Sequence, residues 1–124
     1  MPPACSPMEA GEIVTVAGPL DSIMAGLNCG RVSMVAWPIV STGIDAFIAI
    51  ADERAREAMR ALARAGIVAG ETGAAGLAGL IELLAGAETA RYRAALQLSK
   101  DTRALILVTE GATDPKSYQR IVRR

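Results

Sequence analysis

The sequence predicts an α/β protein, in which a partial three-layer, open, mostly parallel sheet is flanked by helices. Short apolar or β-branched segments alternate along the chain with longer segments of helical periodicity, which is typical of α/β layering. The segment 104–108 (ALILV) is continuously apolar, as are strands that are covered on both faces. Two expected strands also run directly into glycine-containing turns, at 70–73 and 109–111. In open parallel sheets such turns are the places where ligands bind.

The expected strands are short and end at turn-forming or polar residues. EIVTV stops before a Gly-Pro pair, FIAI is followed by Asp52, and IVAG leads into a glycine-rich helix start. Together with ALILV, they give four expected strands at residues 12–16, 47–50, 67–70 and 104–108.

Between these strands the spacing of apolar residues predicts helices. The clearest one begins at Glu53, with Asp52 as a plausible N-cap and Gly66 at its C-terminal end. The last one should begin at Pro115, because Asp114 is a good N-cap and proline is favoured at the first helical position. Three further helices are expected at residues 33–40 (crossed by Pro38), 71–86 and 89–98.

Charge patterning argues against a nucleic-acid or membrane partner. Thirteen basic residues balance thirteen acidic ones, so the chain has no excess positive field. The arginines of the clearest helix are expected to form i,i+3 pairs, Glu53 with Arg56 and Glu57 with Arg60, on a solvated face. The longest uncharged run, 32–44, is too short to cross a bilayer. The N-terminus lacks the features of a secretory signal, so the cytoplasm is the expected compartment.

Few residues could serve as independent catalysts. The chain has no histidine, which removes Ser-His and Cys-His couples and the common zinc motifs. Cys5 and Cys29 are spaced neither as a disulfide framework nor as metal ligands, so no metal site is expected. The only lysines, Lys100 and Lys116, stand in polar segments that are typical of solvated surface.

The two glycine-containing turns are the candidate binding elements. Gly70-Glu71-Thr72-Gly73 and Thr109-Glu110-Gly111 present hydroxyls and backbone amides at the ends of expected strands. The first does not fit a dinucleotide fingerprint, because its spacing is GxxGxxG rather than GxGxxG. An alternative remains open, in which the glycines simply allow a helix to approach a sheet closely.

Four segments carry a resemblance to a known family. They are GPLDSIMAGLNCG (18–30), AWPIV (36–40), DERAREAMRALARAGIVAGETGAAGL (52–77) and TEGATDP (109–115). With these segments the chain resembles the C-terminal part of the diaminopropionate ammonia-lyase family, which belongs to the tryptophan-synthase-β-like, fold-type-II enzymes that use pyridoxal 5'-phosphate. The first and last segments are fairly specific to the lyases, whereas GIVAGETGAAG is common to the wider group.

The resemblance implies a cofactor site at the two turns. It implies that the Thr109 hydroxyl meets the pyridine nitrogen, that Glu71 and Thr72 line the ring near its phenolic oxygen, and that Gly70 and Gly73 let the backbone come close. It also implies that the Schiff-base lysine and the phosphate-binding loop belong to an N-terminal part, so no catalytic residue is expected in this chain. The alternative for Thr109 is that it ends a strand and its hydroxyl caps nearby backbone.

The implied reaction is β-elimination from 2,3-diaminopropionate to pyruvate and ammonia, in a complete enzyme that is a homodimer and takes a small amino acid as substrate. Residues 1–124 are then expected to be the C-terminal part of the enzyme domain, with the N-terminal part missing, and to be inactive alone. A fragment, a truncated gene and a split subunit all fit this expectation. Two other functions stay open: a threonine- or serine-dehydratase-like enzyme, and a non-catalytic remnant that binds cofactor or a partner chain.

Overall fold

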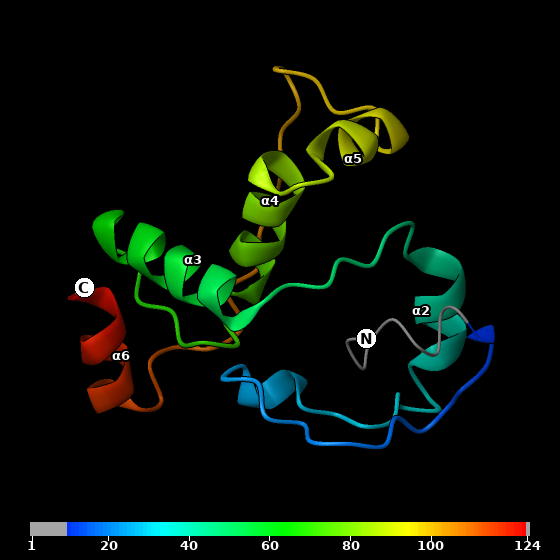
Figure 1. Ribbon diagram of the computed structural model, residues 1–124, viewed down its shortest axis with the longest axis horizontal. Coiled ribbons are helices and arrows are strands. Elements are labelled where there is room, and N and C mark those ends of the chain that lie inside the picture. The colour runs from blue at the N-terminus through cyan, green and yellow to red at the C-terminus, as the bar shows by residue number, and fades with distance from the viewer. Residues whose placement is uncertain (1–9, 124) are drawn as a thin grey trace. The chain divides into compact units, whose positions relative to one another are not determined.

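The computed structural model describes residues 10–123 and divides the chain into two compact units, Met1–Ala49 and Ile50–Arg124. Figure 1 shows the helices of both units. Cys5 and the N-terminal segment around it lie outside the described residues.

The predicted parallel sheet is wrong. Residues 10–123 form helices and irregular segments without a strand, and the β-pairing that occurs there is an isolated antiparallel bridge between Thr15 and Arg31. A strand exists only where a neighbouring segment completes its ladder of backbone hydrogen bonds. Segments 47–50, 67–70 and 104–108 are short and apolar, as predicted, but none pairs with another in a ladder.

In the first unit, a 3-10 turn, η1 (Ala25–Leu27), precedes helix α2 (Trp37–Gly43). Helix α2 begins later than predicted, and Pro38 lies in its first turn instead of crossing its middle. The missing N–H of proline costs nothing there, because the first N–H groups of a helix have no partner within it.

In the second unit, helix α3 (Asp52–Arg64) buries one stripe of side chains. The stripe consists of Ala55, Ala58, Met59 and Leu62, at the i, i+3, i+4, i+7 spacing of a single helix face. The prediction that Asp52 is the N-cap is wrong, because Ala51 takes that position and Asp52 is the first helical residue. A carboxylate in the first turn is still favourable there, because it faces the positive end of the helix dipole.

The glycine predicted at the end of α3 is confirmed. Gly66 has φ 77°, a left-handed conformation that glycine adopts without steric cost. Its N–H donates to Ala63 O at 3.0 Å, and the N–H of Ile67 donates to Leu62 O at 2.9 Å. These two bonds form a Schellman motif, which satisfies the last carbonyls of the helix.

The exposed side of α3 carries ion pairs, partly in the predicted register. Glu53 and Arg56 pair at 3.3 Å as predicted. The predicted partners Glu57 and Arg60 are instead bound elsewhere, Glu57 by Arg54 at 2.8 Å and Arg60 by Glu53 at 3.1 Å. These pairs balance most of the charge on this side, but the side is solvated only in part, because Arg54 also binds Glu82 outside the helix at 2.7 Å.

Three shorter helices complete this unit: α4 (Ala75–Ala85), α5 (Thr89–Ala95) and α6 (Pro115–Val122). Helix α4 begins four residues later than predicted, because residues 71–74 form turns. The predicted start of α6 is confirmed, since the Asp114 carboxylate accepts hydrogen bonds from the N–H groups of Lys116 at 3.0 Å and Ser117 at 3.1 Å.

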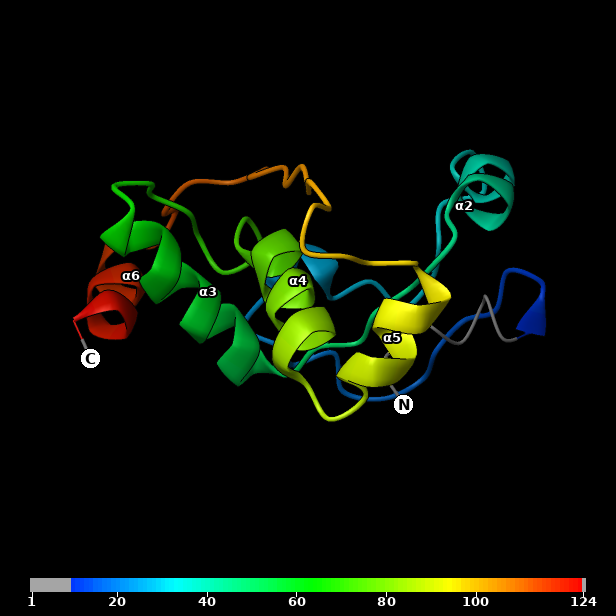
Figure 2. The same ribbon diagram turned by 90° about the horizontal axis from the view of Figure 1, so that it is seen from above.

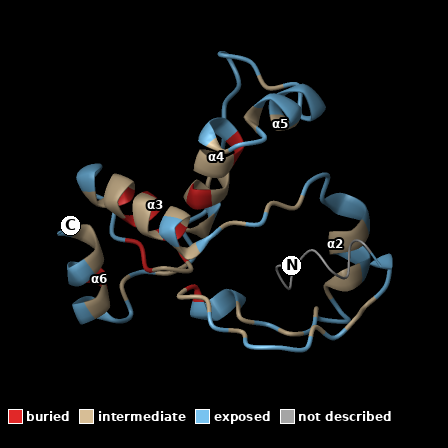
Figure 3. Cartoon of the chain, in the orientation of Figure 1, coloured by how far each residue is buried: buried red, intermediate tan, exposed pale blue. Residues whose placement is uncertain are grey.

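Helix α3 packs against both α4 and α6, and α4 packs against α5. The buried residues of this unit lie mainly on α3, on α4 and in the segment that follows α3 (Figure 3). Most are small, so the elements approach closely around one fully buried large side chain, Met59. The core cluster consists of Ala58, Met59, Leu62, Ala69, Ala74, Ala78 and Tyr118.

Candidate functional site

The two turns singled out in the sequence meet in the structure. The N–H of Gly70 donates to Glu110 O at 3.1 Å. A Cβ added to Gly70 would collide with the Gly111 carbonyl oxygen, and one added to Gly73 would collide with that of Glu110. Both glycines are therefore required for the close approach of 70–73 to 109–111, which is a contact of backbone with backbone.

The contact continues along the start of α4. A Cβ on Gly76 would lie 3.1 Å from Ile106 Cγ2, whereas one on Gly79 would meet nothing within 4 Å. The segment 104–108, orange in Figure 2, thus passes the N-terminal end of α4 before the chain reaches α6. The alternative interpretation, in which these glycines only allow close packing, is correct in part. They allow an irregular segment, and not a sheet, to lie against the start of the helix.

Glu71 is held by a residue that the sequence did not single out. Its Oε1 accepts a hydrogen bond of 2.8 Å from the Ser117 hydroxyl, in the first turn of α6. Both side chains are partly buried. The two residues stand 46 positions apart, and no motif spacing links them, so no signal in a single sequence could have found this contact.

Thr72 and Thr109 supply the hydroxyls of the two turns. Thr72 is half-buried in the first turn, and Thr109 is exposed directly before Glu110. Within residues 10–123 the Thr109 side chain makes no hydrogen bond. Its hydroxyl is therefore available to a ligand, and the alternative in which it caps neighbouring backbone receives no support from the described residues.

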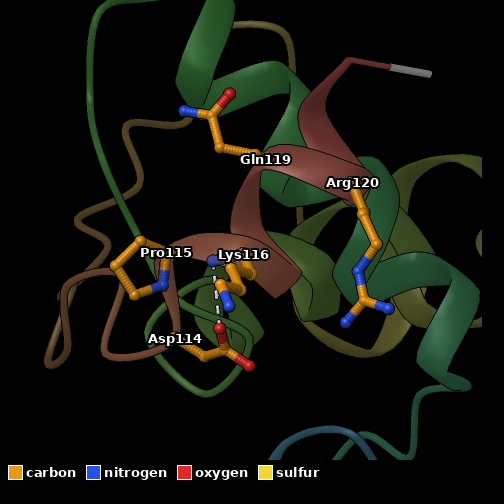
Figure 4. Close-up of a pocket in the computed structure, with 5 residues that line it drawn as sticks. All are labelled: Asp114, Pro115, Lys116, Gln119 and Arg120. Atoms are coloured by element: carbon orange, nitrogen blue, oxygen red, sulfur yellow. Dashed lines mark hydrogen bonds between the residues drawn. The ribbon is translucent and has the colours of Figure 1, made fainter.

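Neither lysine belongs to these turns. Lys100 is exposed in the segment between α5 and 104–108. Lys116 lines an open surface hollow with four other residues of α6 and its N-cap (Figure 4). Lys116 is the sequence neighbour of Ser117, whose hydroxyl binds Glu71 of the first turn. The hollow is lined by Asp114, Pro115, Lys116, Gln119 and Arg120.

Other site types find no support in the part of the chain that is described. Cys29 is a free, exposed thiol, and no group of three or more potential metal ligands occurs among residues 10–123. No helix in this range is both long and apolar enough to cross a membrane.

Residues 1–110 match the family described as pyridoxal-phosphate dependent enzyme, and the chain belongs to this family. The family's cofactor is therefore pyridoxal phosphate, as the resemblance implied.

Curated relatives give a narrower likeness. The chain is 36% identical over 121 residues to diaminopropionate ammonia-lyase of Salmonella typhimurium strain LT2, and 36% identical over 117 residues to the protein of that name from Escherichia coli K12. These matches cover 93% and 90% of this chain. The chain spans only about 30% of the length of the relatives, which are thus much longer proteins.

Proposed function

We propose that this chain forms the cofactor-facing part of an ammonia-lyase that converts 2,3-diaminopropionate and water to pyruvate and two molecules of ammonia. The names of the relatives support this reaction. The structural observation that supports it best is the meeting of turns 70–73 and 109–111 through the hydrogen bond from Gly70 to Glu110. This contact brings together two segments that the resemblance assigns to one cofactor site.

The residues at this contact fit part of the cofactor. Thr109 offers an exposed hydroxyl for the pyridine nitrogen, and Glu71 and Thr72 offer polar groups for the side of the ring that bears the phenolic oxygen. Gly70 and Gly73 hold the two turns together. Among the described residues of the turns there is no lysine and no cluster of basic side chains for the phosphate, so those parts of the site are assigned to the rest of the complete enzyme.

When bound, pyridoxal phosphate would stabilise the negative charge that develops on the substrate α-carbon. Thr109 would then bind the ring nitrogen through a neutral group. A neutral hydroxyl, unlike a carboxylate, does not force that nitrogen to stay protonated. Thr109 would thereby moderate how strongly the ring withdraws electrons and favour elimination over side reactions.

A chimeric enzyme tests this function. The 117-residue region of the Escherichia coli lyase that matches this chain is replaced by this chain, and pyruvate release from 2,3-diaminopropionate is measured. We expect elimination with diaminopropionate and a much lower rate with serine or threonine. A folded, cofactor-loaded chimera that prefers serine or threonine would instead support a dehydratase, and one without activity on any of them would support a non-catalytic remnant.

The isolated chain provides a second measurement. It is incubated with pyridoxal phosphate and reduced with borohydride, and covalent adducts are mapped. We expect no stoichiometric, specific adduct at Lys100 or Lys116, because neither lies in the two turns. Such an adduct would contradict the assignment of the Schiff-base lysine to another part of the enzyme.

A further inference from the structure

The contact between Glu71 and Ser117 joins the first cofactor-facing turn to helix α6. The Ser117 hydroxyl donates to Glu71 Oε1 at 2.8 Å, and the backbone N–H of Ser117 donates to the capping carboxylate of Asp114 at 3.1 Å. Both donor groups of Ser117, its N–H and its hydroxyl, are therefore engaged at the start of the helix. We propose that Ser117 is a positioning residue, which holds the Glu71 carboxylate in place for the cofactor; this inference rests on the proposed function.

Helix α6 is itself anchored, so Ser117 is a fixed donor. Its N-terminal end is capped by Asp114. The next residue after Ser117, Tyr118, is buried in the core cluster, which sets the rotation of the helix about its axis. Near the other end, Arg60 Nε of α3 donates to Ile121 O at 3.2 Å. A donor on such an element constrains its acceptor more than a donor on a free loop does.

The turn that carries Glu71 is also held by the turn at residues 109–111. Gly70 is hydrogen-bonded to Glu110 O, and Gly73 lies directly against the Glu110 backbone. The backbone on both sides of Glu71 is thus fixed, and the remaining freedom is in its side chain. Ser117 removes that freedom by binding Oε1, and since no other described residue bonds to this carboxylate, Oε2 is left for a ligand.

This arrangement predicts an effect on cofactor affinity that is separate from any effect on the stability of the fold. Without the hydroxyl, the Glu71 side chain regains rotamers that point away from the turn. Cofactor binding then has to order this side chain, which makes the free energy of binding less favourable. The loss should be restored by threonine, which carries a hydroxyl at the same position. A residue that merely supports the fold would change stability without changing affinity.

The experiment is a double-mutant cycle in the full chain, with Ser117→Ala, Glu71→Ala and the double variant. Ser117→Thr is the rescue variant, and Ser41→Ala is a matched control from another helix. Unfolding in urea is measured for the chain itself, and equilibrium dialysis with pyridoxal phosphate is measured for the chimeric lyase that carries each variant. We expect the two sites to be coupled by roughly three- to tenfold in the folding equilibrium constant. We also expect Ser117→Ala to weaken cofactor binding several-fold, with recovery in Ser117→Thr.

Additive effects on unfolding would overturn the inference, because the two side chains would then not interact. It would also be overturned if the chimera with Ser117→Ala bound pyridoxal phosphate as tightly as the parent chimera. If a folded chimera with the parent sequence does not bind the cofactor, the proposed function of this region fails, while coupling in the unfolding measurement still supports Ser117 as the residue that positions Glu71.

Discussion

The guanidinium of Arg54 joins helices α3 and α4 through a contact of 2.7 Å between its Nε and Glu82 Oε2. Its Nη1 also binds Glu57 on the same helix at 2.8 Å. These two hydrogen bonds, first that to Glu57 and then that to Glu82, raise the pKa of Arg54 above its ordinary value. Arg54 is thus held by two carboxylates, and through Glu82 it links α4 to α3.

Replacing Arg54 by methionine should therefore lower the stability of the α3–α4 contact. Methionine keeps most of the aliphatic stem but cannot bind either carboxylate. We expect Tm to fall by roughly 2–5 °C, because the pair is partly exposed and water screens it. Arg91→Met is the matched control, since Arg91 pairs with Glu88 on a highly exposed helix face. Equal losses in the two variants would show that the link between helices has no special role.

The pKa of Glu53 predicts that the stability of the fold depends on pH. The hydrogen bond from Arg60, helped by one from Arg56, lowers the pKa of Glu53 from its ordinary 4.5. A carboxylate that is more acidic in the folded state stabilises the fold above its ordinary pKa, and this contribution is lost as pH falls through the lowered value. Glu53→Gln should therefore reduce Tm near neutral pH and have little effect well below pH 4.5. A difference in Tm that is the same at every pH would contradict this cause.

Two glycines of the same region should respond in opposite ways to alanine. In Gly73→Ala the new Cβ would meet the Glu110 backbone, which cannot move without breaking the contact between the turns. We expect a loss of roughly 2–4 kcal/mol in the free energy of unfolding. Gly79 lies inside α4 with open space around it, so Gly79→Ala should stabilise by roughly 0.5–1 kcal/mol. Urea unfolding of both variants checks the pair, and a tolerated Gly73→Ala would mean that the turns do not meet as described.

Helices α3 and α6 could be predicted from the sequence because their signals are local. The apolar stripe of α3 and the glycine at Gly66 lie within one segment, and Asp114-Pro115 defines the start of α6 by itself. The cap of α3 was predicted one residue too late, because Asp52 is acceptable both as a cap and as a first-turn carboxylate.

The sheet could not be predicted reliably because a strand depends on its neighbours. A short apolar run such as 104–108 has the composition of a buried strand, but its composition does not supply the ladder partner. The candidate site shows the same difference between features with a signal in the sequence and contacts that depend on packing. Turns 70–73 and 109–111 were grouped at one site from the expected sheet, which is wrong, and from the resemblance. The contact of Glu71 with Ser117 depends on how α6 packs and has no local signal.

The segment 104–108 leaves apolar side chains in solvent. Leu105 is 88% exposed and Leu107 is 70% exposed. The variant with both leucines replaced by glutamine should bind less hydrophobic dye and self-associate less, while its free energy of unfolding changes by less than about 0.5 kcal/mol. Met59→Ala is the contrasting control, since Met59 is fully buried and its loss should cost about 2–5 kcal/mol. Dye binding that is unchanged by the leucine substitutions would show that this surface is covered in solution.

Thr109 provides the most direct test of the cofactor site. Its side chain is exposed and makes no hydrogen bond within residues 10–123, so Thr109→Val should leave the free energy of unfolding within about 0.5 kcal/mol of the parent value. In the chimeric lyase the same change should weaken cofactor binding and slow elimination, together by roughly 1–3 kcal/mol, because a buried ring nitrogen loses its partner. Thr109→Ser should retain most of both.

Thr113→Val controls for the general effect of removing a hydroxyl from this exposed segment, because Thr113 lies four residues further along and is also exposed. Cofactor affinity and elimination rate should be unchanged in that variant. If Thr109→Val instead alters unfolding while the folded chimera binds pyridoxal phosphate and eliminates ammonia at the parent rate, the hydroxyl has a structural role. Thr109 would then be removed from the site, because the loss of a group that contacts the ring nitrogen must lower the affinity for the cofactor.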